Sequence, residues 1–561
     1  MSDKAHLTKL VLVLLIAGAF LVYLAAITPE SFGYYHDDGI YVTTAKSLAT
    51  NHGYRIISLP YEPAQTKYPP LYPFLLSLIW RVYPHFPENL TPMMVMSALV
   101  TVGCLLLTWF YLTRRGYASN WQALVAVGLT AFNWRTVIVS TGIYSEMLYT
   151  TLTIAGLYLA EEQEQEESDY RKAAALGVVV GLAFLTRTAA IALIIAVAVY
   201  FLIHRKLKRA LLPVAIASSF VAAWLSWAHF SRTPSDALNA AYYTDYFRHL
   251  NNVTRDLQQQ HGDSSRLTII LRIIGWNAYT LVLVMIPLVC LGMGYQEPAA
   301  DQAINVLWLG MISSIFFLIV SGFRRGLVKR IRLLHIYVVL YLAMHLLLPF
   351  GAYDRYLIPL LPFLLVFLIT EITWLANLVR TEMRARGEWA RRVSAGFIAL
   401  LLIAITTVTL RNYFEGVYRG VSSSKRAYVD RASQDAQAIQ WITEHADPSD
   451  VLICYRDPMY YLYSDHKATR YSAFKAGFSV PNSQSGHQEE TSIFRIIAES
   501  NAHYLIITST DLEQDPDPES RRGLYRTIAE RYLQVFARVF ESTDGLCSIY
   551  YTNKEAIPAL Q

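Results

Sequence analysis

The chain has 561 residues, of which 54% are hydrophobic and 16% are charged. The charged fraction is well below the roughly 25% of an average soluble domain, and the net charge of +5 is not gathered into a basic stripe of the kind that binds nucleic acid. The apolar residues form repeated runs of about 20 residues, each long enough to cross a hydrocarbon core of about 30 Å. The composition therefore excludes a wholly soluble protein and predicts a polytopic membrane protein.

The first apolar run covers residues 10–27 and follows Lys4 and Lys9. No small-residue cleavage site closes the run, so we interpret it as an uncleaved transmembrane helix and not as a signal peptide. Its basic flank predicts a cytoplasmic N-terminus, because Lys and Arg in short loops mark that side of a membrane. The loop at residues 29–90 is then extracytoplasmic, with a short helix expected over 39–51.

Further apolar runs alternate with charged loops as far as residue 411. We expect helices over 93–112, 121–139, 145–160, 173–185, 189–203, 211–230, 333–350, 356–379 and 393–410. Segments 269–294 and 304–322 are also apolar, but two full crossings there would leave the basic cluster at 324–332 outside, against the charge rule. We therefore expect one of these two segments to be re-entrant, interfacial or otherwise incomplete, with about 11–13 transmembrane helices in all.

The tail, residues 412–561, is predicted to be a soluble, extracytoplasmic α/β domain. Helical stretches at 432–445 and 521–532 alternate with strand-like runs, which lie at 451–455, 503–508, 535–540 and 547–551. Cys104 and Cys290 lie in apolar runs and are interpreted as packing residues. Cys454 and Cys547 share the tail, where they either stay free or pair in an oxidising compartment. No cysteine has a CxxC or metal-binding spacing.

Two adjacent carboxylates, Asp37 and Asp38, follow the first apolar run. Acids beside a membrane segment are costly to place, although the first turn of a helix would also favour them. The predicted topology brings Glu146, Arg187 and Arg355 to the same outer face. A carboxylate can take a proton from a hydroxyl, and arginines can stabilise a leaving phosphate through paired hydrogen bonds. The pattern therefore indicates transfer from a lipid-phosphate donor to a hydroxyl nucleophile.

The stretch around these acids resembles the first outer loop of the protein O-mannosyltransferase and lipid A aminoarabinose transferase superfamily. The similar positions are Asp37-Asp38, Tyr41, Ala45, Leu48, Gly53 and Lys67-Tyr68-Pro69-Pro70-Leu71. Four later stretches are also similar: IYSEML around Glu146, GLAFLTRTAAI at 181–191, DRYLIPLLPFL at 354–364, and the C-terminal α/β domain. The resemblance implies a GT-C fold, with residues 1–411 as the transmembrane catalytic domain. It also implies a glycosyltransferase of the inner (plasma) membrane that uses a polyprenyl-phosphate sugar.

The resemblance further implies catalytic roles for three acids. Asp37 would be the base with Asp38 in support. Which of the two takes the proton stays open, because the family often has Asp-Glu where this chain has Asp-Asp. Glu146 would be the second acid, near the acceptor or a bound cation.

Basic and aromatic residues complete the expected site. Donor-phosphate binding would fall to Lys67, Arg187 and Arg355 by resemblance, with snorkelling to the interface as the alternative for each arginine. Tyr68 resembles an insertion between Lys67 and its prolines. The substrate pocket is expected to include Tyr35, His36 and Tyr41.

Cofactors and acceptors are less defined by the sequence. No cofactor is assigned and a divalent cation is left open, with His36 and His85 as candidate ligands of a metal-assisted variant. The acceptor would be a glycan, a lipid or a protein, and no nucleic-acid partner is expected. Two rival functions are a transporter or flippase of lipid-linked sugars and an inactive relative whose tail binds a partner. A transporter favours pseudo-symmetric halves, which the sequence does not show.

Overall fold

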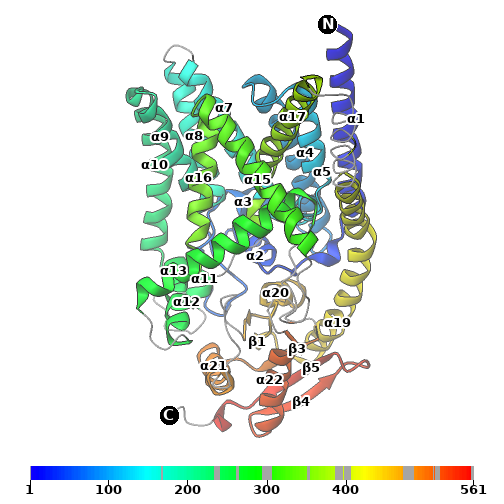
Figure 1. Cartoon of the computed structure of the whole chain (residues 1–561). Coiled ribbons are helices and arrows are strands. Elements are labelled where there is room, and N and C mark those ends of the chain that lie inside the picture. The colour runs from blue at the N-terminus through cyan, green and yellow to red at the C-terminus, as the bar shows by residue number, and fades with distance from the viewer. Residues whose placement is uncertain are drawn as a thin grey trace.

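A bundle of helices carries a small α/β domain at one end (Figure 1). The computed structural model describes residues 2–165, 169–232, 240–260, 265–293, 306–349, 354–385, 396, 406–471, 485–509, 511 and 518–557. The first described residues lie at the end of the bundle away from the α/β domain, and the last described residues lie in that domain. The predicted class, a polytopic α-helical membrane protein with a C-terminal α/β domain, is confirmed.

The helices of the bundle follow one another in chain order. They are α1 (Ser2–Ala26), η1 (Pro29–Ser31), α2 (Asp37–Ala49), α3 (Leu71–Val82), α4 (Leu90–Arg114), α5 (Asn120–Phe132), α6 (Trp134–Thr141), α7 (Glu146–Gln165), α8 (Tyr170–Thr186), η2 (Thr188–Ala190), α9 (Ile191–Ile203), α10 (Leu207–Phe230), α11 (Ala240–Thr244), α12 (Tyr246–Gln260), α13 (Arg266–Asn277), the π-helix η3 (Ala278–Met285), α14 (Ile286–Cys290), α15 (Val306–Lys329), α16 (Leu333–Leu346), η4 (Asp354–Leu357) and α17 (Leu361–Ala385). Within the described residues, six helices are long and apolar enough to cross a membrane, or seven if α5 and α6 form one span. Most of the helix expected over 393–410 falls outside the described residues.

One expected helix is broken in two. The run 121–139 was predicted as a single crossing, but α5 and α6 meet at 61°. Asn133 lies at the break with extended backbone, and its side-chain oxygen accepts the N–H of Arg135. The Asn133 amide also donates to the carbonyl of Val289 at 2.8 Å. The break is explained by a side chain that caps the second helix and also binds a neighbouring one.

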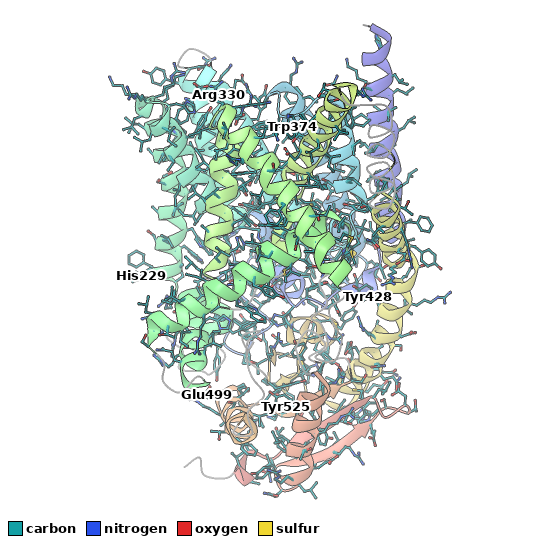
Figure 2. All side chains as sticks on the ribbon, in the orientation of Figure 1. His229, Arg330, Trp374, Tyr428, Glu499 and Tyr525 are labelled. Atoms are coloured by element: carbon teal, nitrogen blue, oxygen red, sulfur yellow. The ribbon has the colours of Figure 1, made fainter. Side chains whose placement is uncertain are left out.

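The arrangement of the two apolar segments before residue 332 agrees with the charge rule. α13, η3 and α14 form one oblique helical run, and α15 then leads to the end of the bundle where Arg330 lies (Figures 1 and 2). There Arg330 contacts Glu164 at 2.7 Å, and Lys206 contacts the same carboxylate at 2.7 Å. The basic clusters at 204–209 and 324–332 therefore share one end of the bundle, opposite the domain that holds Glu499 and Tyr525.

The α/β domain is built on a five-stranded sheet with the order β2-β1-β3-β5-β4. Its elements are α19 (Ser424–His445), β1 (Leu452–Ile453), α20 (Asp457–Ser464), β2 (Ala468–Thr469), α21 (Ser485–Ser500), β3 (Tyr504–Thr508), α22 (Pro518–Arg531), β4 (Phe536–Glu541), β5 (Cys547–Thr552) and η6 (Lys554–Ala556). Strands β2, β1 and β3 are parallel, and β5 pairs antiparallel with β3 and β4. The four predicted strand runs are confirmed, whereas β2, α20 and α21 were not predicted.

Two further observations concern the start of this domain and its cysteines. Helical residues 406–418 continue through η5 (Arg419–Ser423) into α19, so the chain crosses the predicted boundary at 411/412 without leaving helical conformation. Cys454 and Cys547 are both free and buried. In the sheet, β3 lies between β1, which ends just before Cys454, and β5, which begins with Cys547. The alternative of a disulfide between these two cysteines is therefore wrong.

The α/β domain packs directly on the loop at residues 29–90. Lys467 contacts Glu62 at 2.5 Å, Lys46 contacts Asp465 at 2.8 Å, and the Ala468 N–H donates to the carbonyl of Ser58 at 2.8 Å. One buried apolar cluster contains residues of both parts, including Tyr41, Tyr72, Met459 and Ala438. The loop and the domain therefore form a continuous core, which positions the residues that follow.

Candidate active site

A cavity of about 1550 Å³ lies where the bundle meets the α/β domain. Its apolar lining includes Ile191, Val221, Trp224, Leu225, Met344, Leu347 and Leu348. Its basic lining comprises Lys67, Arg135, Arg187, Arg232, Arg355, Arg419, Arg431, Arg456 and Arg470. A cavity with an apolar wall and many cations fits an anionic amphiphile.

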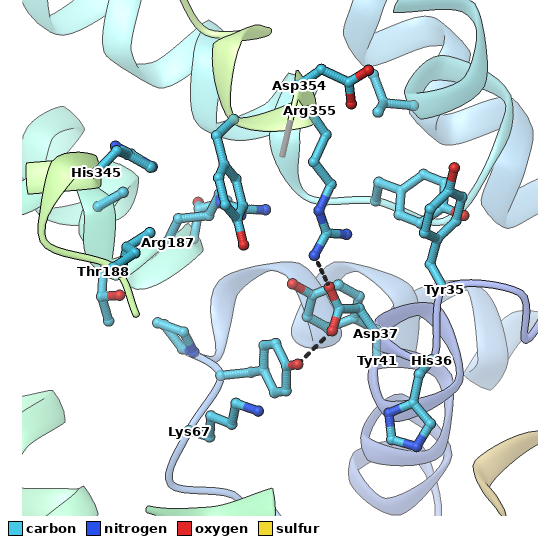
Figure 3. A pocket seen from close by; sticks show the side chains of 18 of the residues that line it. Tyr35, His36, Asp37, Tyr41, Lys67, Arg187, Thr188, His345, Asp354 and Arg355 are labelled. Carbon is cyan, nitrogen blue, oxygen red and sulfur yellow. Dashed lines mark hydrogen bonds and ion pairs between the residues drawn. The ribbon is translucent and has the colours of Figure 1, made fainter. Parts of the chain in front are cut away.

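Asp37, the first residue of α2, faces this cavity. Its Oδ2 accepts a hydrogen bond from Arg355 Nη2 at 2.9 Å, and its Oδ1 accepts one from the Tyr68 hydroxyl at 2.6 Å (Figure 3). Burial raises the pKa of Asp37, but Arg355, Tyr68 and Lys67 outweigh burial and lower the pKa to about 2. Asp37 is therefore an ionised carboxylate, held in one orientation by two donors.

Asp38 has different surroundings. Its two oxygens accept the backbone N–H groups of Gly33 and Gly39, each at 2.8 Å. The side chain is only 2% exposed, and burial raises its pKa to about 7 despite these hydrogen bonds. Among the described residues Asp38 does not border the cavity, whereas Asp37 does. Asp38 stabilises the turn that leads into α2.

His36 precedes Asp37 in an unusual backbone conformation, with φ 63° and ψ −39°. Such a conformation costs about 1–3 kcal/mol and persists only where the surroundings impose it. Its Nε2 lies 2.7 Å from Asp457 Oδ1, and its Nδ1 lies 3.0 Å from the Tyr242 hydroxyl. Both ring nitrogens are thus engaged by protein groups. In the described part of the chain, no group of three or more His, Cys, Asp or Glu side chains converges as a metal site.

Lys67 reaches the cavity from the loop before α3. Its Nζ donates to the carbonyl of Tyr242 at 2.7 Å and lies 4.2 Å from the centre of the Tyr242 ring. Burial lowers the pKa of Lys67 to about 8, although the charge of Asp37 opposes this. Lys67 is therefore a cation whose charge is lost in mildly alkaline solution.

Arg187, on the opposite side of Asp37 from Tyr35 and His36 (Figure 3), joins two of the expected residues. Its Nη1 lies 2.9 Å from Glu146 Oε1 and donates to Ser145 Oγ at 3.1 Å, and the Tyr41 hydroxyl lies 3.1 Å from the same oxygen. Glu146 is 3% exposed and lies behind Arg187, outside the lining of the cavity. Glu146 is thus placed to hold Arg187.

Several residues of the site were not anticipated from the sequence. Tyr68, which resembled an insertion, donates directly to Asp37. Arg135 Nε donates to Asp354 at 2.6 Å, and its Nη1 donates to the Tyr35 hydroxyl at 3.3 Å. An arginine inside an apolar run was an available signal for Arg135. Tyr242 lies in a segment without periodicity, so no local pattern pointed to it.

Comparisons with known proteins agree with this architecture. The family model described as dolichyl-phosphate-mannose-protein mannosyltransferase matches residues 67–227. This range includes Lys67, Glu146 and Arg187 but neither Asp37 nor Arg355. No curated protein sequence matches the chain significantly.

Three solved structures are similar over nearly the whole chain. The oligosaccharyltransferase AglB of Archaeoglobus fulgidus, solved with an inhibitory peptide and a dolichol-phosphate, has a TM-score of 0.55 at 14% identity, covering 99% of this chain and 75% of that one. The same organism's oligosaccharyltransferase tethered to an acceptor peptide gives 0.53 at 12%, covering 98% and 74%. ArnT of Cupriavidus metallidurans bound to undecaprenyl phosphate gives 0.51 at 14%, covering 98% and 99%.

The fold is therefore that of the GT-C glycosyltransferases. Within that class, the family match and the fold confirm the resemblance to the protein O-mannosyltransferase and lipid A aminoarabinose transferase superfamily.

Proposed function

We propose that this protein transfers a sugar from a polyprenyl-phosphate donor to an acceptor hydroxyl on the extracytoplasmic face of the membrane, with Asp37 as the catalytic base. The observation that carries the proposal is the place of Asp37. It is an ionised carboxylate in a cation-rich cavity, fixed between Arg355 and Tyr68. A base must lie within about 2.6–3.2 Å of the proton that it removes, and the cavity gives a substrate access to it.

The donor would lie along the apolar wall of α10 and α16, with its phosphate toward Lys67 and Arg355. A guanidinium can bind phosphate oxygens through two parallel hydrogen bonds. A fixed cation also stabilises the charge that grows on the leaving phosphate. Arg187 lines the same cavity but already pairs with Glu146, so we assign it a supporting electrostatic role and assign Glu146 the role of holding it.

The reaction would be a single displacement. Asp37 takes the proton of the acceptor hydroxyl, and the oxygen forms a bond to the anomeric carbon as the carbon–oxygen bond to phosphate breaks. The phosphate leaves with the electron pair, and the configuration at the sugar carbon inverts. When the donor phosphate shares Arg355, the guanidinium lowers the pKa of Asp37 less strongly. Donor binding would therefore make Asp37 a stronger base when it is needed.

The geometry favours Asp37 over Asp38 as the base, because Asp38 accepts two backbone hydrogen bonds and lies behind the cavity wall. The rival proposal, a transporter of lipid-linked sugars, would use an ionised acid in the cavity for proton coupling and not as a base toward an acceptor hydroxyl. It also predicts a different product, since transport leaves the bond between sugar and phosphate intact.

Purified protein in proteoliposomes, supplied with radiolabelled polyprenyl-phosphate sugar and a membrane extract as the source of acceptor, tests both proposals. We expect free polyprenyl phosphate and labelled acceptor from the wild type. Asp37→Asn should lower the rate by about 10²–10⁴-fold, and Asp38→Asn, the matched control, should lower it far less. Full activity of a folded Asp37→Asn variant would show that Asp37 is not the catalytic base. Movement of intact donor across the membrane without cleavage would favour the transporter.

A further inference from the structure

The α/β domain touches the start of α2 through a buried histidine–carboxylate contact. His36 Nε2 and Asp457 Oδ1 are 2.7 Å apart, with side-chain exposures of 7% and 0%. The other ring nitrogen faces the Tyr242 hydroxyl at 3.0 Å, which in turn lies 3.5 Å from Arg470 Nη1. Two segments distant in the sequence, around Tyr242 and Asp457, thus hold the His36 ring, and neither ring nitrogen is left to bind a substrate.

The backbone of His36 sets the direction of the first turn of α2. Its carbonyl accepts the N–H of Ile40 at 3.1 Å, and its positive φ turns the chain into the helix. Asp37 is the next residue, so the position of its carboxylate depends on this backbone conformation. A His36 ring held at both nitrogens therefore fixes the backbone of His36, and with it the backbone that leads into Asp37.

Close packing supports the same contact. A Cβ added to Gly39 would lie 2.9 Å from Pro458 Cβ, and one added to Gly33 would lie 2.8 Å from Met459 Sδ. Pro458 and Met459 follow Asp457 in α20. The turns around Asp37 and the first turn of α20 therefore meet without space for another methyl group.

We propose that Asp457 is a positioning residue of the α/β domain, which places Asp37 for catalysis by holding His36. The role of Asp37 as base rests on the function proposed above, whereas the structural coupling of Asp457 to Asp37 does not. Among the described residues Asp457 is not itself in the cavity lining, but it contacts His36, which lines the cavity and directly precedes Asp37.

Three variants separate this role from simple loss of stability. Asp457→Ala removes the acceptor for the His36 N–H and should lower kcat by about 10²-fold, as expected for a misplaced catalytic group, with the KM for donor little changed. Asp457→Asn offers an amide oxygen at the same place and should recover most of kcat. Asp465→Ala, the control, removes the contact that Asp465, the residue after α20, makes with Lys46 of α2, and should keep wild-type kcat.

A double-mutant cycle with His36→Asn adds an independent check. If both residues act through one contact, the double variant should lose no more kcat than Asp457→Ala alone. Additive losses, equal losses in Asp457→Ala and Asp457→Asn, or equal kcat in Asp457→Ala and Asp465→Ala would each overturn the proposal.

Should Asp457→Ala fail to fold, Tyr242→Phe removes the other hydrogen bond to His36. It should lower kcat at unchanged KM, and wild-type kcat in this variant would equally overturn the proposal.

A cryo-EM structure of Asp457→Ala gives a readout that does not depend on activity. We expect the Asp37 carboxylate to leave the position in which its Oδ2 lies 2.9 Å from Arg355 Nη2. An inactive wild type with a displaced Asp37 in the variant would refute the proposed function but not the positioning role. An active wild type with an undisplaced Asp37 in the variant would refute the positioning role alone.

Discussion

Asp37 and Asp38 are adjacent in the sequence but belong to different environments. One is bound by side chains that line a cavity, and the other by backbone N–H groups behind it. Successive residues of a helix point about 100° apart, and here Asp37 lines the cavity whereas Asp38 is not among the described lining residues. The sequence could place both acids near the membrane surface, but only the helix that they begin shows which one lines the cavity.

The titration of Lys67 predicts that activity falls in alkaline solution. Its pKa is lowered to about 8, so it is charged below that pH and neutral above it. We expect kcat/KM for donor to fall as the pH rises through about 8, because the neutral amine no longer attracts phosphate. Asp37, with a pKa of about 2, should cause no fall between about pH 5 and 7. A pH profile of sugar transfer measures both the expected fall above about pH 8 and the expected constant rate between about pH 5 and 7.

Lys67→Arg is the control for this profile. Arginine stays protonated at every pH used, so the alkaline limb should disappear or move up. A limb near pH 8 that persists in Lys67→Arg would assign it to another group.

At the scale of residues, the contacts that the sequence did not predict are those between residues separated along the chain. Asp37, Lys67 and Arg355 stand in motifs that resemble a known superfamily, and the structure brings all three to one cavity. Tyr68 was interpreted as an insertion because nothing local shows that its hydroxyl reaches Asp37. Asp457 lies 421 residues from His36, and no periodicity in the sequence indicates a contact of that separation.

At the scale of elements, the fit between α2 and α20 depends on a small residue. Gly39 lies in a helix and has no room for a methyl group, whereas Gly103 of α4 has no heavy atom within 4 Å of an added Cβ. We expect Gly39→Ala to separate the two helices and lower both Tm and kcat. Gly103→Ala should be neutral or stabilising by about 0.5–1 kcal/mol, since alanine favours a helix.

Thermal unfolding in detergent and the transfer assay measure this difference. A Gly39→Ala variant with the Tm and kcat of Gly103→Ala would show that the contact tolerates expansion.

Long apolar elements were predicted more reliably than short or interrupted ones. The helices over 93–112 and 211–230 correspond to α4 and α10, since about 20 apolar residues determine a span without further information. The break between α5 and α6 depends on Asn133, whose partner Val289 comes from a distant helix. Strand β2 has only two residues, and it forms because β1 offers an edge for pairing.

At the scale of the whole molecule, the basic clusters at 204–209 and 324–332 and the α/β domain occupy opposite ends of the bundle. The charge rule therefore predicts that the α/β domain and the cavity lie outside. All four cysteines are buried, so an introduced exposed cysteine should be the main target of a thiol reagent. We expect Glu444→Cys to react with a membrane-impermeant maleimide in intact cells and Lys208→Cys to react only after permeabilisation. The reverse pattern would invert the topology.

The large sequence separation of the His36–Asp457 contact has a consequence for biosynthesis. At about 5–20 residues per second, a ribosome needs roughly 20–80 s to travel from His36 to Asp457. Throughout that interval the helices of the bundle can enter the membrane, but the residue that holds His36 does not yet exist. If Asp457 places Asp37 as proposed, Asp37 is among the first residues made and among the last to be placed, and the nascent chain becomes catalytically competent only once its final domain has folded.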